Sequence, residues 1–312
     1  MTVTGRATTG RGAGTRRAGA APPRRRVSPA AMTMFLLVAP SVFLLVLINA
    51  YPLVYAAWQS LHSGTLISAG DFVGFSNYTD TLTSPPFWKA VRFTVIFTIV
   101  GVFGSWLVGM GLALLLRTRI PARGLFKVLL LLPWVVPIVV SSTSWNWLVA
   151  TPDSPLPKLA EALGLGTPLF LANPTLAQIT VCVFKVWVSF PFMMLMTSAA
   201  LASVDDNVYE ASSMDGAGKW QQFWHITLPM ISRSTYISWI LMTIFCVNDF
   251  PTIFLLTGGG PVDATTSLVV LSYRTVFQDF RVGPGVAIAF IMTLTLVVVS
   301  VILYRQIRKA HV

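Results

Sequence analysis

Charged residues are scarce in this chain of 312 residues. Asp, Glu, Lys and Arg make up 11% of it, whereas a soluble globular protein carries about 25%. Hydrophobic residues make up 54%, so the charges are too few to cover the surface of a water-soluble domain. This composition excludes an ordinary soluble protein and predicts a chain embedded in a membrane.

Cysteine and histidine are also rare. Cys182 and Cys246 are the two cysteines, and both lie in apolar stretches, which excludes a disulfide framework or a cysteine-rich metal site. The three histidines, His62, His225 and His311, fall in separate loops without metal-ligand spacing. We therefore expect no catalytic residue and no metal site, and a membrane-embedded enzyme remains only a remote alternative.

A phosphate-binding loop is missing as well. The segment 216–219 reads Gly-Ala-Gly-Lys, but Trp220 follows it instead of Ser or Thr, and the glycine spacing of the ATPase motif is absent. We expect no cofactor in this chain, and a partner must supply the energy for any transport.

Acidic residues are absent from the first 70 positions, and the first one in the chain is Asp71. The first 30 residues hold seven of the 22 Lys and Arg, separated by Gly, Ala, Thr and Pro. Nucleic-acid binding would need a folded basic face with aromatic residues. We interpret residues 1–30 instead as a disordered cytoplasmic tail beside an anionic membrane surface, and we expect no nucleic-acid partner.

Long apolar stretches dominate the rest of the chain, and each approaches or exceeds the roughly 20 residues that cross a bilayer as a helix. They lie at about 31–58, 93–116, 128–150, 175–197, 231–256 and 286–304. We expect an all-α, polytopic membrane protein whose transmembrane domain covers residues 31–312. Pro191 is expected to break the fourth stretch.

The distribution of Lys and Arg predicts the orientation of these spans. If the N-terminus is inside, 16 basic residues fall on the inner side and five on the outer side. Positive charges are retained in the cytoplasm, so both termini are predicted to be cytoplasmic.

The inner loop at about 203–229 is polar and too long for a simple turn. Asp205 or Asp206 is expected to cap a first short helix, which glycines interrupt. A second helix should carry one apolar face, ending before Pro229 begins the fifth span; this face comprises Trp220, Phe223, Trp224 and Leu228. Such a loop either docks into a partner protein or lies flat on lipid headgroups.

The loop also carries a recognisable motif. It reads Glu210-Ala211-Ser212, three residues, Gly216, nine residues, and then Ile226-Thr227-Leu228-Pro229. This resembles the EAA loop of bacterial ABC-importer permeases, with Ser212 in place of the second alanine, a departure expected to have little consequence. Further pieces resemble the carbohydrate permeases of that class: Ala39-Pro40, Tyr51-Pro52, Phe72-Val73-Gly74-Phe75-Ser76-Asn77-Tyr78 and Leu256-Thr257-Gly258-Gly259-Gly260-Pro261.

From about residue 30 to its end, the chain resembles the first permease subunit of maltose- and glycerol-phosphate-type importers, with a MetI-like fold. The resemblance implies a multi-pass protein of the bacterial cytoplasmic (inner) membrane that imports a mono-, di- or oligosaccharide or a sugar derivative by alternating access. It also implies a second permease, two copies of an ATPase that binds ATP and Mg²⁺, an extracytoplasmic sugar-binding lipoprotein and surrounding membrane lipid. A permease for a peptide or phosphate is the alternative.

The resemblance implies a role for the loop in coupling to the ATPase. The expected coupling residues are Glu210, Ala211, Ser212, Asp215, Gly216, Ile226, Leu228 and Pro229. Within the loop, the aromatic face at 220–224 is expected to anchor the loop to the transmembrane bundle.

Two charged residues, Lys185 and Asp249, lie inside predicted spans, where charges are costly. They either form a structural ion pair or line a polar pathway for the substrate. The positions resembling the sugar contacts of maltose-type relatives are Lys185, Ser189, Phe192, Met242, Phe245, Cys246 and Asp249.

Overall fold

The computed structural model describes residues 29–68, 70–118 and 121–309, so the predicted tail lies almost entirely outside the described residues. Two units, residues 1–53 and 54–312, meet within α1 (Pro29–Ser60). In the first unit the described residues belong to α1, an apolar helix that contains Pro40 and Pro52. The second unit holds the predicted site and is described below.

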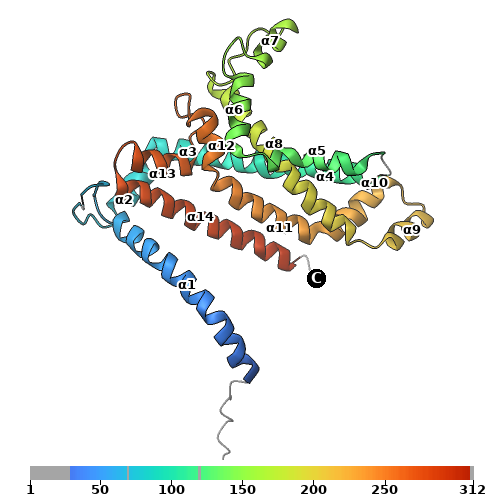
Figure 1. Ribbon diagram of the computed structural model, residues 1–312, viewed down its shortest axis with the longest axis horizontal. Helices are drawn as coiled ribbons and strands as arrows, with labels where there is room; N and C mark the ends of the chain where they lie inside the picture. The colour runs from blue at the N-terminus through green and yellow to red at the C-terminus, as the bar shows by residue number, and fades with distance from the viewer. Residues whose placement is uncertain (1–28, 69, 119–120, 310–312) are drawn as a thin grey trace, which may run out of the picture. The chain divides into compact units, whose positions relative to one another are not determined.

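The described residues are helical almost throughout, with one isolated antiparallel bridge between His62 and Phe72. Figure 1 shows the order of the elements after α1. In chain order they are α2 (Ser76–Thr83), α3 (Pro85–Ile99), the π-helix η1 (Val100–Gly104), α4 (Ser105–Arg117), α5 (Arg123–Val135), α6 (Ile138–Val149), α7 (Pro155–Ala162), α8 (Pro174–Ala202), α9 (Asp206–Met214), α10 (Lys219–Gln222), the π-helix η2 (Phe223–Thr227), α11 (Leu228–Val247), α12 (Phe250–Thr257), α13 (Leu268–Phe277) and α14 (Val282–Lys309).

Five continuous helices in the described part are long and apolar enough to cross a membrane. They are Met32–Ser60, Pro85–Arg117, Pro174–Ala202, Lys219–Val247 and Val282–Arg305. A sixth candidate is the pair α5 and α6, which meet at an angle of 91°. These helices account for six apolar stretches, although several boundaries differ from those predicted.

The third stretch, expected to be one span at 128–150, is divided at Val136. Val136 has an extended backbone (φ −66°, ψ 133°) because the ring of the following Pro137 disfavours a helical residue before it. The third predicted span therefore corresponds to a pair of helices joined by a sharp bend.

Pro191 does not break the fourth span, contrary to expectation. α8 runs without interruption through it, and Pro191 is buried. A proline inside a membrane helix is tolerated where neighbouring helices pack around the freed backbone groups. The interruption occurs instead in the fifth stretch, at Asn248 and Asp249, between α11 and α12.

The fifth span begins earlier than Pro229. The chain is helical from Lys219 through η2 into α11. Pro229 would clash with the carbonyl four residues before it in a regular α-helix. The wider π-turn of η2 directly before Leu228 is a known way to accommodate such a local distortion.

The core of the second unit lies between α3, α4, α8 and α11. Phe97 and Phe184 are fully buried at its centre, and a second cluster around Met110 and Met194 lies nearer to α9. α4 packs closely on α8, since a methyl group added at Gly109 would lie 2.6 Å from the backbone nitrogen of Met194. Small residues allow this close helix packing in membranes.

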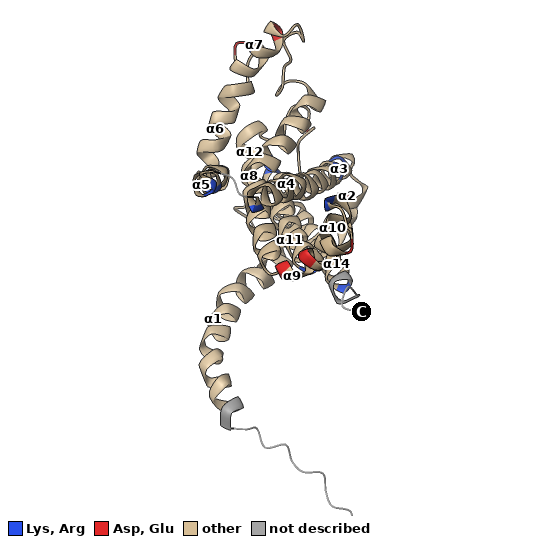
Figure 2. Cartoon of the chain, turned by 90° about the vertical axis from the view of Figure 1, so that its right-hand side faces the viewer, with Lys and Arg blue, Asp and Glu red and all other residues tan. Residues whose placement is uncertain are grey.

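Figure 2 shows how few charged residues occur along these helices, most of which are drawn in tan. Acidic residues lie near α9 and around α7. The long helices of the second unit therefore present mainly apolar side chains, as membrane spans require.

Candidate functional site

The first candidate region is the loop between α8 and α11, which folds as two helices joined by a tight elbow. Asp205 is the N-cap of α9, and its carboxylate accepts a hydrogen bond from the backbone N–H of Asn207 at 2.9 Å. Gly216 follows α9 with φ +83°, a conformation that glycine adopts without the steric cost paid by other residues. The predicted cap and the glycine interruption are both present.

The outer side of this elbow is exposed. Met214 is 88% exposed, and Glu210, Ala211 and Asp215 are exposed as well. Figure 1 shows α9 and α10 at one end of the helices α4, α8 and α11. The elbow thus presents a carboxylate and a flexible apolar side chain together at a projecting end of the bundle.

The inner side of the elbow is held by Tyr209, a residue without a predicted role. Its ring lies 4.4 Å from the guanidinium carbon of Arg117, and its hydroxyl lies 3.1 Å from the hydroxyl of Thr227. Arg117 also forms a 2.5 Å ion pair with Asp206 in the first turn of α9. These contacts join α9 to the end of α4 and to η2.

Ser212, the departure from the usual alanine, has a structural role. Gln222 Nε2 donates hydrogen bonds to the hydroxyls of Ser212 at 3.0 Å and Ser213 at 2.9 Å. These bonds connect α9 to α10 across the elbow. The substitution is therefore more than the replacement of one small residue by another.

The expected anchoring of the loop by its aromatic face is contradicted. Trp220 is 73% exposed and Trp224 48% exposed, and their rings pack mainly against each other and Phe223. The π-helix η2 adds a residue to the helical turn between Trp220 and Leu228. The side chains at 220–224 therefore lie on a different face of the helix from Leu228, which packs on the core. Of the four residues, Leu228 is the one that packs on the core cluster near α9.

The remaining predicted coupling residues lie in η2 and at its junction with α11. Ile226 and Leu228 are half-buried, whereas Pro229 is exposed. They lie in one continuous helix with the fifth span.

The second candidate region is a buried ion pair between α8 and the break after α11. Lys185 Nζ lies 2.6 Å from Asp249 Oδ2, and both side chains are less than 10% exposed. Asp249 also caps α12, because its carboxylate accepts hydrogen bonds from the backbone N–H and the hydroxyl of Thr252 at 3.1 and 2.8 Å. The aspartate is thus fully satisfied by this chain alone, as a buried charge requires.

A close approach of the second span shapes this region. A methyl group added at Gly101 in η1 would lie 2.7 Å from Cys246 Sγ and 3.2 Å from Lys185 Cγ. Glycine at this position lets η1 pack directly against the lysine stem. Gly101 is not among the residues predicted from the sequence, although small residues spaced along an apolar helix are a signal for close packing.

The other predicted pathway residues divide by accessibility. Ser189, Met242 and Cys246 are buried in the second unit. Phe245 is 51% exposed, and its ring centroid lies 5.8 Å from that of the half-buried Phe192. The structure therefore brings the two aromatic rings together, while the polar pair lies among buried residues.

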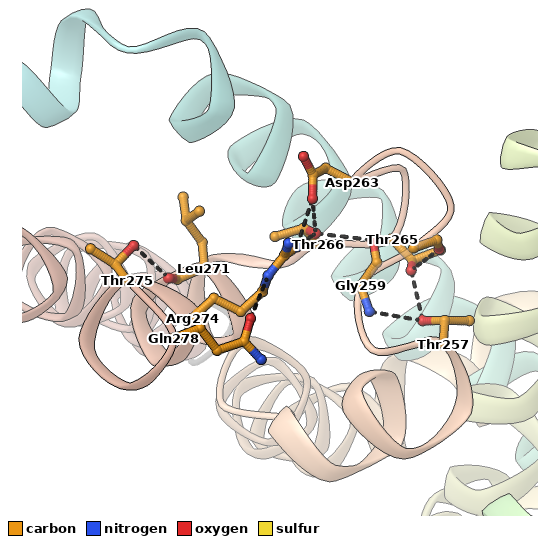
Figure 3. Close-up of polar contacts among 10 residues, drawn as sticks. Thr257, Gly259, Asp263, Thr265, Thr266, Leu271, Arg274, Thr275 and Gln278 are labelled. Atoms are coloured by element: carbon orange, nitrogen blue, oxygen red, sulfur yellow. Dashed lines mark hydrogen bonds and ion pairs between the residues drawn. The ribbon is translucent and has the colours of Figure 1, made fainter. Parts of the chain in front are cut away.

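The loop after α12, which contains the Gly258-Gly259-Gly260-Pro261 segment, is closed by polar contacts (Figure 3). The hydroxyls of Thr257 and Thr265 lie 2.7 Å apart, and Thr266 donates a hydrogen bond to the carbonyl of Gly259 at 3.0 Å. At its edge, Asp263 forms a 2.6 Å ion pair with Arg274 of α13. The contacts hold this glycine-rich segment in a defined conformation against α13.

The first outer loop has a structural arrangement of its own. The side-chain amide of Asn77 donates to the carbonyls of Ser60 and His62 at 2.8 and 3.0 Å, and Tyr78 donates to the Ser60 hydroxyl at 2.8 Å. The Asn-Tyr piece noted in the sequence therefore fixes α2 to the chain segment before it.

Comparison with known proteins bears on the identity of the whole chain. Residues 105–311 match the model of the family described as "Binding-protein-dependent transport system inner membrane component". The chain belongs to this family. It is accordingly the membrane-integral permease component of an ABC transporter, as the resemblance of the inner loop predicted.

Curated relatives match over most of their length. A trehalose/maltose transport system permease protein, MalF, of Thermococcus litoralis is 31% identical over 88% of this chain and 93% of its own. A sulfoquinovosyl glycerol transport system permease protein, SmoG, of Agrobacterium fabrum is 32% identical over 88% of this chain and 89% of its own. A probable ABC transporter permease protein of Sinorhizobium fredii is 36% identical over 93% of this chain and 94% of its own.

A solved structure has the same fold. The chain is similar to one from a bacterial ABC transporter involved in the import of the acidic polysaccharide alginate, with a TM-score of 0.78. The match covers 90% of this chain and 96% of the other at 18% sequence identity. The MetI-like permease fold predicted from the sequence is thereby confirmed.

Proposed function

We propose that this chain is one of two permease subunits of an ABC importer that carries a carbohydrate across the bacterial cytoplasmic membrane by alternating access. The single observation that supports the substrate class is the near full-length match to permeases named for trehalose, maltose and sulfoquinovosyl glycerol. The transported compound is then a sugar, an oligosaccharide or a sugar derivative.

The α9–α10 elbow is the proposed contact with the ATPase subunits. Its support is geometric, since Glu210 and Met214 are exposed at the end of the bundle while Tyr209 fixes the opposite side to the spans. Glu210 offers a carboxylate for a basic group on the ATPase, and Met214 offers an adaptable apolar contact. Movement of the ATPase would reach α11 through η2.

ATP and Mg²⁺ are proposed to bind to the partner ATPase and not to this chain. The incomplete glycine-lysine segment at 216–219 supports this division, because Trp220 follows its lysine and it lies in the elbow proposed to contact the ATPase. This chain is then a non-catalytic subunit that converts the closure of two ATPase copies into movement of its spans.

The substrate path is proposed to run along the faces of α8 and α11 that carry Phe192 and Phe245. Aromatic rings can stack on the apolar face of a sugar, and Phe245 is accessible in this chain. The Lys185–Asp249 pair and the residues Ser189, Met242 and Cys246, from the same region of α8 and α11, are buried. The second permease would supply the opposite wall, and an extracytoplasmic binding lipoprotein would deliver the sugar.

Reconstitution of the assembled importer in proteoliposomes tests this function. ATP hydrolysis is measured after addition of the binding protein loaded with trehalose, maltose or other saccharides, and uptake is followed with labelled sugar. Sugar-dependent hydrolysis and uptake that require this chain would support the proposal. Stimulation by peptides or phosphate but by no carbohydrate would contradict it.

A further inference from the structure

A cavity lies at the ends of three spans, beside the first turn of α9. Its volume is about 170 Å³, and one water takes up about 30 Å³ in the liquid, so it can hold a group of several heavy atoms. α4 ends here at Arg117, α5 begins here at Arg123, and α8 ends nearby at Ala202. The cavity therefore lies at the depth where a span meets the polar headgroups of a bilayer.

The polar wall of the cavity is strongly basic. Arg117, Arg123 and Lys127 line it, with Asp206 as the one acidic residue in the lining. Asp206 is paired with Arg117, and no acidic partner contacts Arg123 or Lys127 within the described residues. Among the described residues, the cavity thus carries two positive charges without an acidic partner.

The spacing of Arg123 and Lys127, the two basic residues without an acidic partner, favours binding of an anion between them. Arg123 and Lys127 are four residues apart on α5, so they lie on the same face of the helix and repel each other. An anionic group between them would remove this repulsion. The positive charge of the cavity therefore favours a ligand with about two negative charges, or a phosphate diester that contacts all three basic side chains.

The opposite wall is apolar and buried. It includes Leu116 of α4 and Leu201 of α8, which are 3% and 4% exposed. Because the protein already covers these two side chains almost completely, they leave a lipid little apolar surface to contact. A lipid phosphate is favoured over a soluble one by the position of the cavity at the ends of the spans, where phospholipid headgroups lie. Basic pockets between spans on the cytoplasmic side are suited to anionic lipid headgroups.

We propose that this cavity binds the phosphate headgroup of an anionic phospholipid, with Arg123 and Lys127 as its principal ligands. The lipid phosphate lies between these two side chains and Arg117, and its glycerol and acyl chains extend from the cavity into the bilayer. Because Arg117 also holds Asp206 and Tyr209, the lipid is bound next to the joint that supports the α9–α10 elbow. The proposal does not depend on which solute is transported.

Lipid binding to the purified, delipidated importer tests the site. Dioctanoyl phosphatidylglycerol is titrated in neutral detergent, and bound lipid is counted by native mass spectrometry for the wild type and for Arg123→Gln/Lys127→Gln. Each basic residue beside an anionic headgroup contributes roughly fivefold to affinity. We expect the double variant to bind the lipid about 25-fold more weakly.

The matched control is Arg233→Gln/Arg305→Gln. These two residues are exposed in α11 and α14 and do not line the cavity. Their substitution removes the same amount of charge from the same predicted side of the membrane. The control should bind phosphatidylglycerol as the wild type does. Arg123→Lys/Lys127→Arg, which preserves both charges, should retain most of the affinity.

Two results would overturn the proposal. Equal lipid binding by the wild type and by a correctly assembled Arg123→Gln/Lys127→Gln variant would exclude the cavity as the binding site. Displacement of the lipid by inorganic phosphate or glycerol 3-phosphate at comparable concentration would show that a soluble phosphate compound, and not a lipid, is the ligand.

Discussion

Lys185 Nζ lies 2.6 Å from Asp249 Oδ2, and the same aspartate caps the helix that restarts after the break in the fifth span. The carboxylate of Asp249 therefore neutralises the buried Lys185 and also caps the first turn of α12, where the helix resumes after α11. The ion pair is a structural feature of this chain whether or not a substrate also approaches it.

The pair predicts a characteristic result in a double-mutant cycle. Lys185→Met leaves Asp249 buried without its cation, which should cost about 3–5 kcal/mol of stability. Lys185→Met combined with Asp249→Asn should recover much of this loss, because asparagine removes the charge but can still cap α12. Thermal unfolding of the assembled importer in detergent measures both variants.

The cycle also separates structure from substrate binding. If the pair is structural only, the double variant should regain sugar-stimulated ATP hydrolysis together with stability. Equal loss of hydrolysis in the single and double variants, when both are folded and assembled, would instead favour direct contact with the substrate.

Gly216 should be sensitive to substitution because its φ is +83°. Gly216→Val forces a branched side chain into a left-handed conformation, at a cost of at least about 1–2 kcal/mol locally. We expect insertion into the membrane to be retained and transport to be lost. Gly218→Ala is the matched control, since Gly218 has φ −71°, and uptake should stay near the wild-type rate.

Glu210→Lys should uncouple the importer without unfolding it. Glu210 is exposed, so reversal of its charge should disturb a partner surface and not the fold. Sugar-stimulated ATP hydrolysis should fall at least tenfold, the equivalent of about 1.4 kcal/mol of lost interaction. Glu161→Lys, on exposed α7, should leave hydrolysis unchanged; a similar loss there would indicate a general effect of charge.

Two glycines of the second span should respond oppositely to alanine. Gly101→Ala places a methyl group 2.7 Å from Cys246 Sγ and should destabilise the protein by about 1–3 kcal/mol. Gly111→Ala meets no atom within 4 Å and should be neutral or stabilising by up to about 1 kcal/mol. Thermal unfolding of the two variants compares them directly, and equal melting temperatures would refute the close packing of η1.

Much of the architecture could be predicted because membrane spans leave a strong signal in apolar length. The inner loop was predictable for a different reason, since a cap at Asp205 and a glycine at position 216 define the two ends of a short helix. The orientation of the termini remains a prediction from the distribution of Lys and Arg.

Proline positions account for only part of the breaks in the spans, since Pro137 explains the bend in the third stretch but Pro191 breaks no helix. Pro191 lies in a continuous helix, whereas the fifth stretch is interrupted at Asp249, which pairs with Lys185 of a different helix. Such a partner is far away in sequence. Local rules therefore placed the discontinuity in the wrong span.

The aromatic face of the elbow failed as a prediction because the helix changes its period. Trp220 and Leu228 share a face at 3.6 residues per turn, but the π-turn at 223–227 separates them. Tyr209 and Gln222 hold the elbow instead. Their roles depend on contacts between α9, α10 and η2 that become evident only when the loop is folded.

The most direct test of the coupling account is photo-crosslinking from Met214, which is 88% exposed at the elbow. A photoreactive amino acid is placed there in the assembled, transport-competent importer, and at Leu165 beyond α7, which is 75% exposed, as the control. The account predicts a crosslink to the ATPase subunit from position 214 and none from position 165. Absence of an ATPase crosslink from 214, or an equal one from 165, would contradict the coupling role of the α9–α10 elbow.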